Sequence, residues 1–318
     1  MEYKYHGTYW LKEGFSYPSL YQYIEQTKEK LIQPLKIPEY ATANESERIK
    51  SISEKLQQNP YLSRAAYAEA AKQERNGISN LRTISFDDYP SLYEVCMFAS
   101  KTLTGVLPLI FLYTADEGSG YTYNAMALDY MDKVWVYISD QFFKEQGMLK
   151  DEELSFLVGH ELGHAQCHHV TIASAKKDSS DTEYSADRAG MIVCARWIME
   201  HEPQHSPEEV SQLAALYGSA ALLKLGIAMT NGRNKTNWHT AFDYGKTREM
   251  LDGIFDGASK LTVSAGTHPH TRHRIMAMIN FSQSQLFYRC LGLDPSQYQG
   301  LLTDKQLQTM MAYQLKSE

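Results

Sequence analysis

A His-Glu-x-x-His segment at residues 160–164 constrains what this 318-residue chain can form more than any other feature. His160 and His164 are four positions apart, so on a helix their imidazoles share one face and lie one turn from each other. At that spacing a helix can hold both rings on one Zn²⁺ ion, with Glu161 beside the metal as a base for bound water. Acidic residues at 151–153 and apolar residues at 154, 157 and 158 predict that this helix begins near residue 151.

Two glycines interrupt the same predicted helix. Gly159 and Gly163 each lower helix stability by about 1 kcal/mol relative to alanine. A glycine inside a helix often has a packing reason, such as a second backbone that approaches closely. We therefore expect another segment to pass against this face of the helix, as a strand that holds a substrate would.

A second helix is predicted over residues 181–195, and it carries acidic groups that can complete a metal site. Asp181 or Thr182 can cap its first turn, and its alanine-rich face suits close packing on a neighbour. Glu183 can be the third ligand, which leaves a fourth position open for water. Asp187 lies one turn further along, where it can accept a hydrogen bond from the outer nitrogen of a ligating histidine. The simpler interpretation is an amphipathic helix with exposed acids.

Together these motifs resemble the M48 family of zinc metallopeptidases, the Ste24/HtpX-like group of the gluzincins. The motifs that carry the resemblance are His160-Glu161-x-x-His164 and Glu183-x-x-Ala186-Asp187. Two further segments support the resemblance. The first is Thr267-His268-Pro269 followed by Arg274-Ile275, which is similar to the C-terminal His-Pro…Arg element of the family. The segment from Tyr123 to Leu128 looks like the Asn-Ala-containing edge strand on which gluzincins lay their substrate. The resemblance covers about residues 85–285.

The resemblance implies a role for each site residue. One Zn²⁺ ion per chain would be held by His160, His164 and Glu183, with Glu161 as the catalytic base and Asp187 behind a ligand. The oxyanion would be stabilised by His268 and Arg274, and the substrate backbone would be bound at Asn124 and Ala125. His268 has an alternative role as a fourth ligand that blocks the open position and holds the enzyme latent.

The implied fold is α+β and mainly helical. It is a gluzincin-like core with a small, mostly antiparallel three-stranded sheet packed on the active-site helix. The implied activity is that of a metalloendopeptidase that hydrolyses extended or unfolded polypeptides, with protein quality control as a candidate setting. Membrane-bound members carry transmembrane helices around this core, whereas only 18 residues, many of them polar, separate His164 from Glu183. The chain therefore resembles a soluble, minimal form of the family.

Periodicity along the chain predicts mostly helices and one group of strands. Helices are expected over residues 17–33, 45–58, 60–75, 87–103, 207–224, 241–256, 271–286 and 303–315, and strands over 107–115, 121–129 and 133–139. The polar stretch 230–240 is expected to be a loop. We predict an N-terminal arm and helical layer (1–84), a peptidase domain (85–290) and a C-terminal helical extension (291–318).

Composition bounds the partners and the compartment. The net charge of −7 argues against nucleic acid or an anionic membrane as a main partner. The family resemblance implies a peptide or an unfolded protein as the partner. The longest apolar stretch, residues 106–113, is far shorter than the ~20 residues of a membrane span, and the amino terminus lacks a signal pattern. The four cysteines lack paired spacing, which favours free thiols and a cytoplasmic protein. The sequence does not indicate an oligomeric state.

Three alternatives stay open at this point. The whole chain can be a catalytically latent, zinc-containing protein that binds peptides in the manner of a chaperone, although Glu161 would then have no purpose. Near the metal, His168 can approach the ion or can line the helix end together with His169. Cys167 can be a redox switch or a small buried apolar residue.

Overall fold

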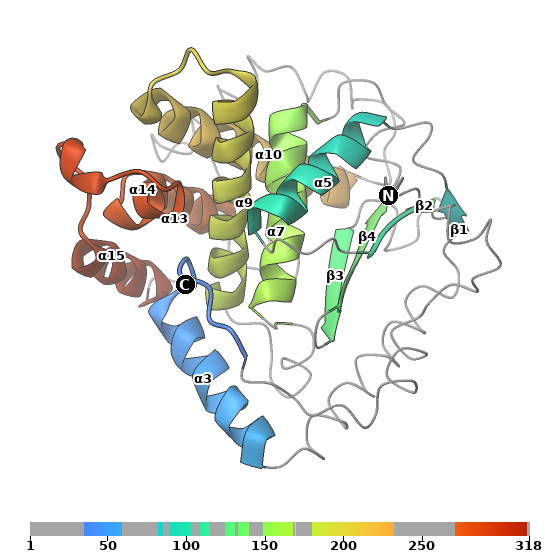
Figure 1. The fold of residues 1–318 in the computed structure, drawn as a ribbon, viewed down its shortest axis with the longest axis horizontal. Coiled ribbons are helices and arrows are strands. Elements are labelled where there is room, and N and C mark those ends of the chain that lie inside the picture. Colours follow the sequence, from blue (N-terminus) through green and yellow to red (C-terminus); the bar gives the residue numbers. More distant parts are fainter. Residues whose placement is uncertain are drawn as a thin grey trace.

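A computed structural model of the chain describes residues 35–58, 82–84, 90–103, 109–114, 125–130, 133–139, 149–167, 169, 180–231 and 271–316. The described residues are mainly helical, as the sequence predicts. They also include a small sheet, which lies to one side of the helices (Figure 1). None of the helices in these ranges has the length and the apolar composition needed to cross a membrane.

Two helices form the centre of the fold, α7 (Asp151–Gln166) and α9 (Ser180–His201). They lie side by side and make the most extensive contact between any two described elements (Figure 1). Helix α7 begins where its acidic first turn predicts, and the carboxylate of Glu153 accepts a hydrogen bond of 2.9 Å from the backbone N–H of Lys150. This bond satisfies one of the donors that a helix start leaves without an intrahelical partner.

The glycines of α7 make this close contact possible. A β-carbon on Gly159 would lie 2.8 Å from Cβ of Val193, and one on Gly163 would lie 2.6 Å from Cβ of Ala189. The expected approach of a second backbone is therefore correct. The suggested partner was wrong, because the backbone that approaches these glycines belongs to helix α9 and not to a strand.

Other helices enclose the central pair. Helix α5 (Pro90–Leu103) packs on α7 in one apolar cluster, while α10 (Pro207–Asn231) and α13 (Thr271–Ser282) contribute to a second cluster around α9. Helix α3 (Ala43–Gln58), from the N-terminal part of the sequence, also contacts α9 (Figure 1). Helix α10 also supplies Lys224, whose Nζ lies 2.6 and 2.7 Å from the two carboxylate oxygens of Glu153, and this buried ion pair joins α10 to the start of α7.

The sheet has the strand order β1-β2-β4-β3. Its strands are β1 (Arg82–Ile84), β2 (Leu109–Thr114), β3 (Ala125–Tyr130) and β4 (Lys133–Ser139). Two of its three pairings are antiparallel, but β2 and β4 are parallel, and β1 is a strand that the sequence did not predict. Among the described strands β3 pairs on one side only, and it also contacts α7.

The C-terminal part differs from the expected single helix over 271–286. Helix α13 ends at Ser282, and α14 (Gln285–Cys290) begins after Ser284, whose hydroxyl oxygen accepts a hydrogen bond from the backbone N–H of Phe287. Ser284 also forms a parallel bridge with Leu302. The chain then continues through the 3₁₀ turn η3 (Pro295–Gln297) into α15 (Asp304–Lys316). The serine cap and the backbone bridge thus divide the segment that periodicity alone predicts to be one helix.

Several expectations lie outside the described residues. They are the N-terminal arm, the helices over 17–33, 60–75 and 241–256, and most of the expected loop over 230–240, whose first two residues belong to the end of α10.

Candidate metal centre

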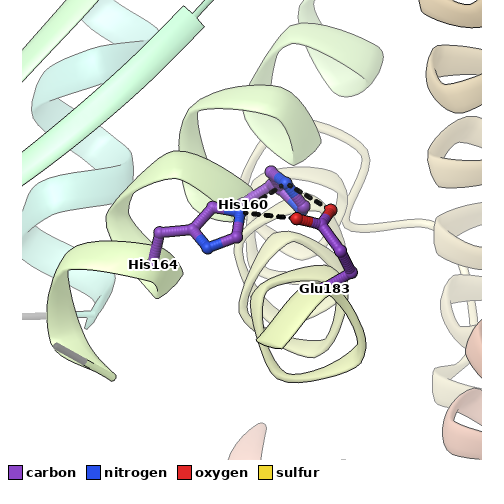
Figure 2. Close-up of side chains that lie close together, drawn as sticks. All are labelled: His160, His164 and Glu183. Atoms are coloured by element: carbon purple, nitrogen blue, oxygen red, sulfur yellow. Dashed lines mark hydrogen bonds and ion pairs between the residues drawn. The ribbon is translucent and has the colours of Figure 1, made fainter. Parts of the chain in front are cut away.

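Helices α7 and α9 bring three predicted ligands together. Nε2 of His160 lies 3.0 Å from Nε2 of His164. Each of these nitrogens also faces one oxygen of Glu183, at 3.6 Å for His160 and 3.5 Å for His164. Figure 2 shows the carboxylate of Glu183 directed from its own helix toward both rings. The three side chains therefore form a group that can hold a metal ion.

The size of this triangle can be compared with the coordination geometry of a metal. Ligands at about 2.0–2.1 Å from a tetrahedral ion lie about 3.3 Å from one another. The observed separations of 3.0, 3.5 and 3.6 Å are close to that value. Two imidazoles with one carboxylate are a donor set found in hydrolytic metal sites, in which the fourth position is left for water or substrate. The residues therefore fit a tetrahedral metal ion.

Burial favours the neutral, metal-binding form of His164. His160 and Glu183 are only 7% and 4% exposed, and His164 is partly buried. Burial lowers the pKa of His164 far below its usual value; Glu183 opposes this effect, while the neighbouring His160 and His169 add to it. His164 is therefore neutral near pH 7, which is the form of imidazole that binds a metal.

Behind the first histidine lies Asp187. Its Oδ1 is 3.0 Å from Nδ1 of His160, the ring nitrogen on the far side from the metal triangle. Burial disfavours protonation of His160, yet the negative charge of Asp187 prevails and raises the pKa of the ring. Asp187 is thus placed next to the ligand that it was expected to orient.

Arg274 extends from α13 to both acidic residues. Its Nε and Nη2 donate to the two oxygens of Asp187 at 2.8 and 2.6 Å, and its Nη1 lies 3.1 Å from Oε2 of Glu183. These contacts support a role in holding the two carboxylates in place. The role of oxyanion donor, which the resemblance implies for Arg274 together with His268, stays a prediction.

Behind His164 lies a group formed by His169, Glu45 and Arg48, which was not predicted from the sequence. Nδ1 of His164 is 2.7 Å from Nδ1 of His169, and Nε2 of His169 is 3.0 Å from Oε2 of Glu45 on helix α3. Arg48, one turn after Glu45, binds the same carboxylate. The only sequence signal for this group was the Glu45–Arg48 spacing of i,i+3, which is common on exposed helices.

The remaining predicted residues are located as follows. Glu161 is buried at 8% exposure directly after His160, and its charge contributes to the raised pKa of Arg274. Ala125 is half-buried and begins strand β3. Asn124, His168 and His268 lie outside the described residues. Cys167 is fully buried, as expected of a small apolar residue.

No protein-family model matches the chain, and neither a curated protein nor a solved structure matches it significantly.

Proposed function

We propose that the chain is a zinc-dependent metalloendopeptidase of the M48 type, acting on extended or unfolded polypeptides. The observation that carries the proposal is the triangle formed by His160, His164 and Glu183, with separations of 3.0–3.6 Å. Glu161, directly after His160 in the sequence, is buried as well. A structural zinc site has four protein ligands, whereas the described part of the chain offers three here, which is the ligand number of a catalytic site with a fourth position for water.

Zinc is the ion that fits this donor set best. Nitrogen and carboxylate donors in a tetrahedral arrangement are typical of catalytic Zn²⁺, whereas Mg²⁺ and Ca²⁺ prefer six or more oxygens. A zinc ion bound there would supply a water molecule of lowered pKa and would polarise the carbonyl group of a substrate.

The residues of the chain supply the remaining functions. Glu161 follows a ligand directly, so its carboxylate can accept a proton from the attacking water and transfer it to the leaving amine. Asp187 and Arg274 fix the orientation of His160 and Glu183, which would keep the ligands in place during turnover.

Strand β3 offers a place for the substrate. Among the described strands it is an edge strand, and it packs beside α7, the helix that carries two of the ligands. An extended peptide can pair with such an edge through backbone hydrogen bonds, which bind many sequences with little selection of side chains. This supports an unfolded polypeptide as the substrate class.

Glu161→Gln tests the proposal. Purified wild type is expected to contain about one zinc per chain and to hydrolyse unfolded casein or a quenched fluorescent peptide. Glu161→Gln is expected to keep the zinc and to lose hydrolysis, because the base is removed and the ligands are not. Zinc content is measured by elemental analysis on the same samples.

Two results contradict the proposal. Equal turnover by wild type and Glu161→Gln would exclude Glu161 as the base. A wild type that retains zinc and binds unfolded casein but never cleaves it would instead identify a latent peptide-binding protein.

A further inference from the structure

A line of buried polar contacts connects the metal centre to helix α3. It begins at Nδ1 of His164, passes through both nitrogens of His169 and ends at the carboxylate of Glu45, with separations of 2.7 and 3.0 Å. His169 is 4% exposed and Glu45 is 1% exposed. Since both side chains are almost completely withdrawn from water, their polar atoms depend on these partners.

The requirements of metal binding determine the direction of each hydrogen bond. If Nε2 of His164 offers its lone pair to the metal, the proton of the neutral ring is on Nδ1. Among the described residues, the partner of that nitrogen is Nδ1 of His169, which then acts as the acceptor. The proton of His169 is then on Nε2 and is donated to Glu45, which as a carboxylate can only accept.

Arg48 keeps the end of this line charged and fixed in place. Its Nε lies 3.0 Å from both oxygens of Glu45, and its Nη2 lies 2.6 Å from Oε2. The same Nη2 donates a 2.9 Å hydrogen bond to the backbone carbonyl of Cys167, at the end of α7. Helix α3 is also joined to α9, because the backbone N–H of Thr42, just before α3, donates to Oγ of Ser185. Glu45 is thus fixed relative to both helices that carry ligands.

The two ligand histidines have equivalent support. Behind His160 lies a carboxylate with its arginine, Asp187 and Arg274, in direct contact. Behind His164 lies another such pair, Glu45 and Arg48, with His169 in between. The pair on the His164 side comes from a helix more than 100 residues earlier in the sequence, so correct docking of α3 is needed to complete it.

We infer that His169 and Glu45 are positioning residues that act in series to fix the tautomer and the orientation of His164, which makes helix α3 a part of the metal centre. The inference rests on the proposed metal site and adds to it a second element of the fold. Neither residue touches the metal position, so both act through His164.

Zinc affinity tests this inference without relying on catalysis. Zinc binding is measured by competition with a chelator, and the visible spectrum of the Co²⁺-loaded protein reports ligand geometry. His169→Phe keeps a ring of similar size but removes the acceptor and the donor. We expect it to bind zinc about 10–100-fold more weakly, because loss of a partner behind a ligating histidine has effects of that size. Glu45→Gln is expected to weaken binding in the same direction.

Two further variants separate positioning from general damage. The double variant His169→Phe/Glu45→Gln is expected to be no weaker than His169→Phe alone, because residues that act in series are not additive. His169→Gln restores an acceptor and a donor, and it is expected to recover part of the affinity and of the Co²⁺ spectrum.

Glu153→Gln is the matched control. Glu153 is as buried as Glu45 and pairs with a cation, Lys224, but it lies near the start of α7, away from the ligands. We expect this variant to lower thermal stability and to leave zinc affinity unchanged.

The outcomes distinguish the inference from the proposed function. If wild type binds no zinc, or if Glu183→Ala binds it equally well, the proposed metal centre fails. If wild type and Glu183→Ala behave as expected but His169→Phe keeps wild-type affinity, the metal centre stands and the inference is overturned. Additive losses in the double variant, or an equal loss in Glu153→Gln, would also overturn it. Should His169→Phe fail to fold, Glu45→Gln and His169→Gln provide the same comparison.

Discussion

Arg274 donates two hydrogen bonds to Asp187, from Nε at 2.8 Å and from Nη2 at 2.6 Å. The third guanidinium nitrogen lies 3.1 Å from Glu183, so one cation neutralises two buried carboxylates. Burial alone would raise the pKa of Asp187, but the charge and the hydrogen bonds of Arg274 lower it below its usual value. Arg274 thus supplies positive charge that offsets the negative charge of both buried carboxylates.

Arg274→Met is expected to destabilise the metal-free protein by about 3–5 kcal/mol, because it leaves two buried carboxylates without their cation. Added zinc is expected to recover part of this loss, since the ion supplies positive charge next to Glu183. Urea unfolding with chelator and with zinc measures both effects. Equal stability of wild type and Arg274→Met in chelator would show that the pair has another source of compensation.

Glu183→Ala is expected to abolish stoichiometric zinc binding. Two imidazoles alone make an incomplete site, and the fold offers no second carboxylate in the described metal group. Isothermal titration with zinc measures the change, and circular dichroism verifies that the helices are retained. Unchanged zinc content in this variant would mean that a different side chain is the third ligand.

Gly163→Ala tests the contact between α7 and α9. Its new methyl would lie 2.6 Å from Cβ of Ala189, so the two helices must separate locally. We expect a loss of about 1–3 kcal/mol in stability, together with weaker zinc binding because Glu183 moves away from the histidines.

Gly218→Ala is the control for this experiment. Its methyl would be crowded in a similar way, 2.9 Å from the ring of Phe156, but on the α10 side of α7. We expect a loss of stability without a loss of zinc affinity. If both glycine variants bind zinc like wild type, the spacing of the helices does not control the site.

The contribution of Glu45 to stability is expected to depend on pH. Burial raises the pKa of Glu45, but hydrogen bonds from His169 and Arg48 outweigh burial, and the net pKa is lowered. A carboxylate with a lowered pKa in the folded state stabilises the protein above its unfolded pKa and ceases to do so as the pH falls through the folded value. The difference in unfolding free energy between metal-free wild type and Glu45→Gln is therefore expected to be largest near pH 7 and to shrink below about pH 4–5. Chemical unfolding from pH 3.5 to pH 7 measures it, and a constant difference would contradict the assignment.

The ligands could be predicted from the sequence because local geometry fixes them. The spacing of His160 and His164 on one helix leaves little freedom, and the acidic first turn marks where that helix begins. Glu183 was also predictable, since it opens a second helix with an alanine-rich face. In each case the signal lies within a few turns of a single helix.

Contacts between distant segments left no such signal. His169 and Glu45 are 124 positions apart, and nothing in their neighbourhoods indicates that they meet. The parallel pairing of β2 with β4 was hidden for a similar reason, because strands that follow one another at short intervals suggest a simple antiparallel order. Gly163 was predictable only in part, because its sequence context predicts a close neighbour but does not identify that neighbour.

The glycine contact between α7 and α9 has a consequence for how an ion would enter the site. Because apolar packing sets the separation of the two helices, the fold itself holds the three ligand atoms at distances close to those around a tetrahedral ion. Such a site is preorganised, because folding orders the ligand side chains. Metal binding then requires little further loss of conformational entropy. If the proposed function holds, chelation is expected to yield a protein that retains its native shape and binds zinc again when the ion is returned.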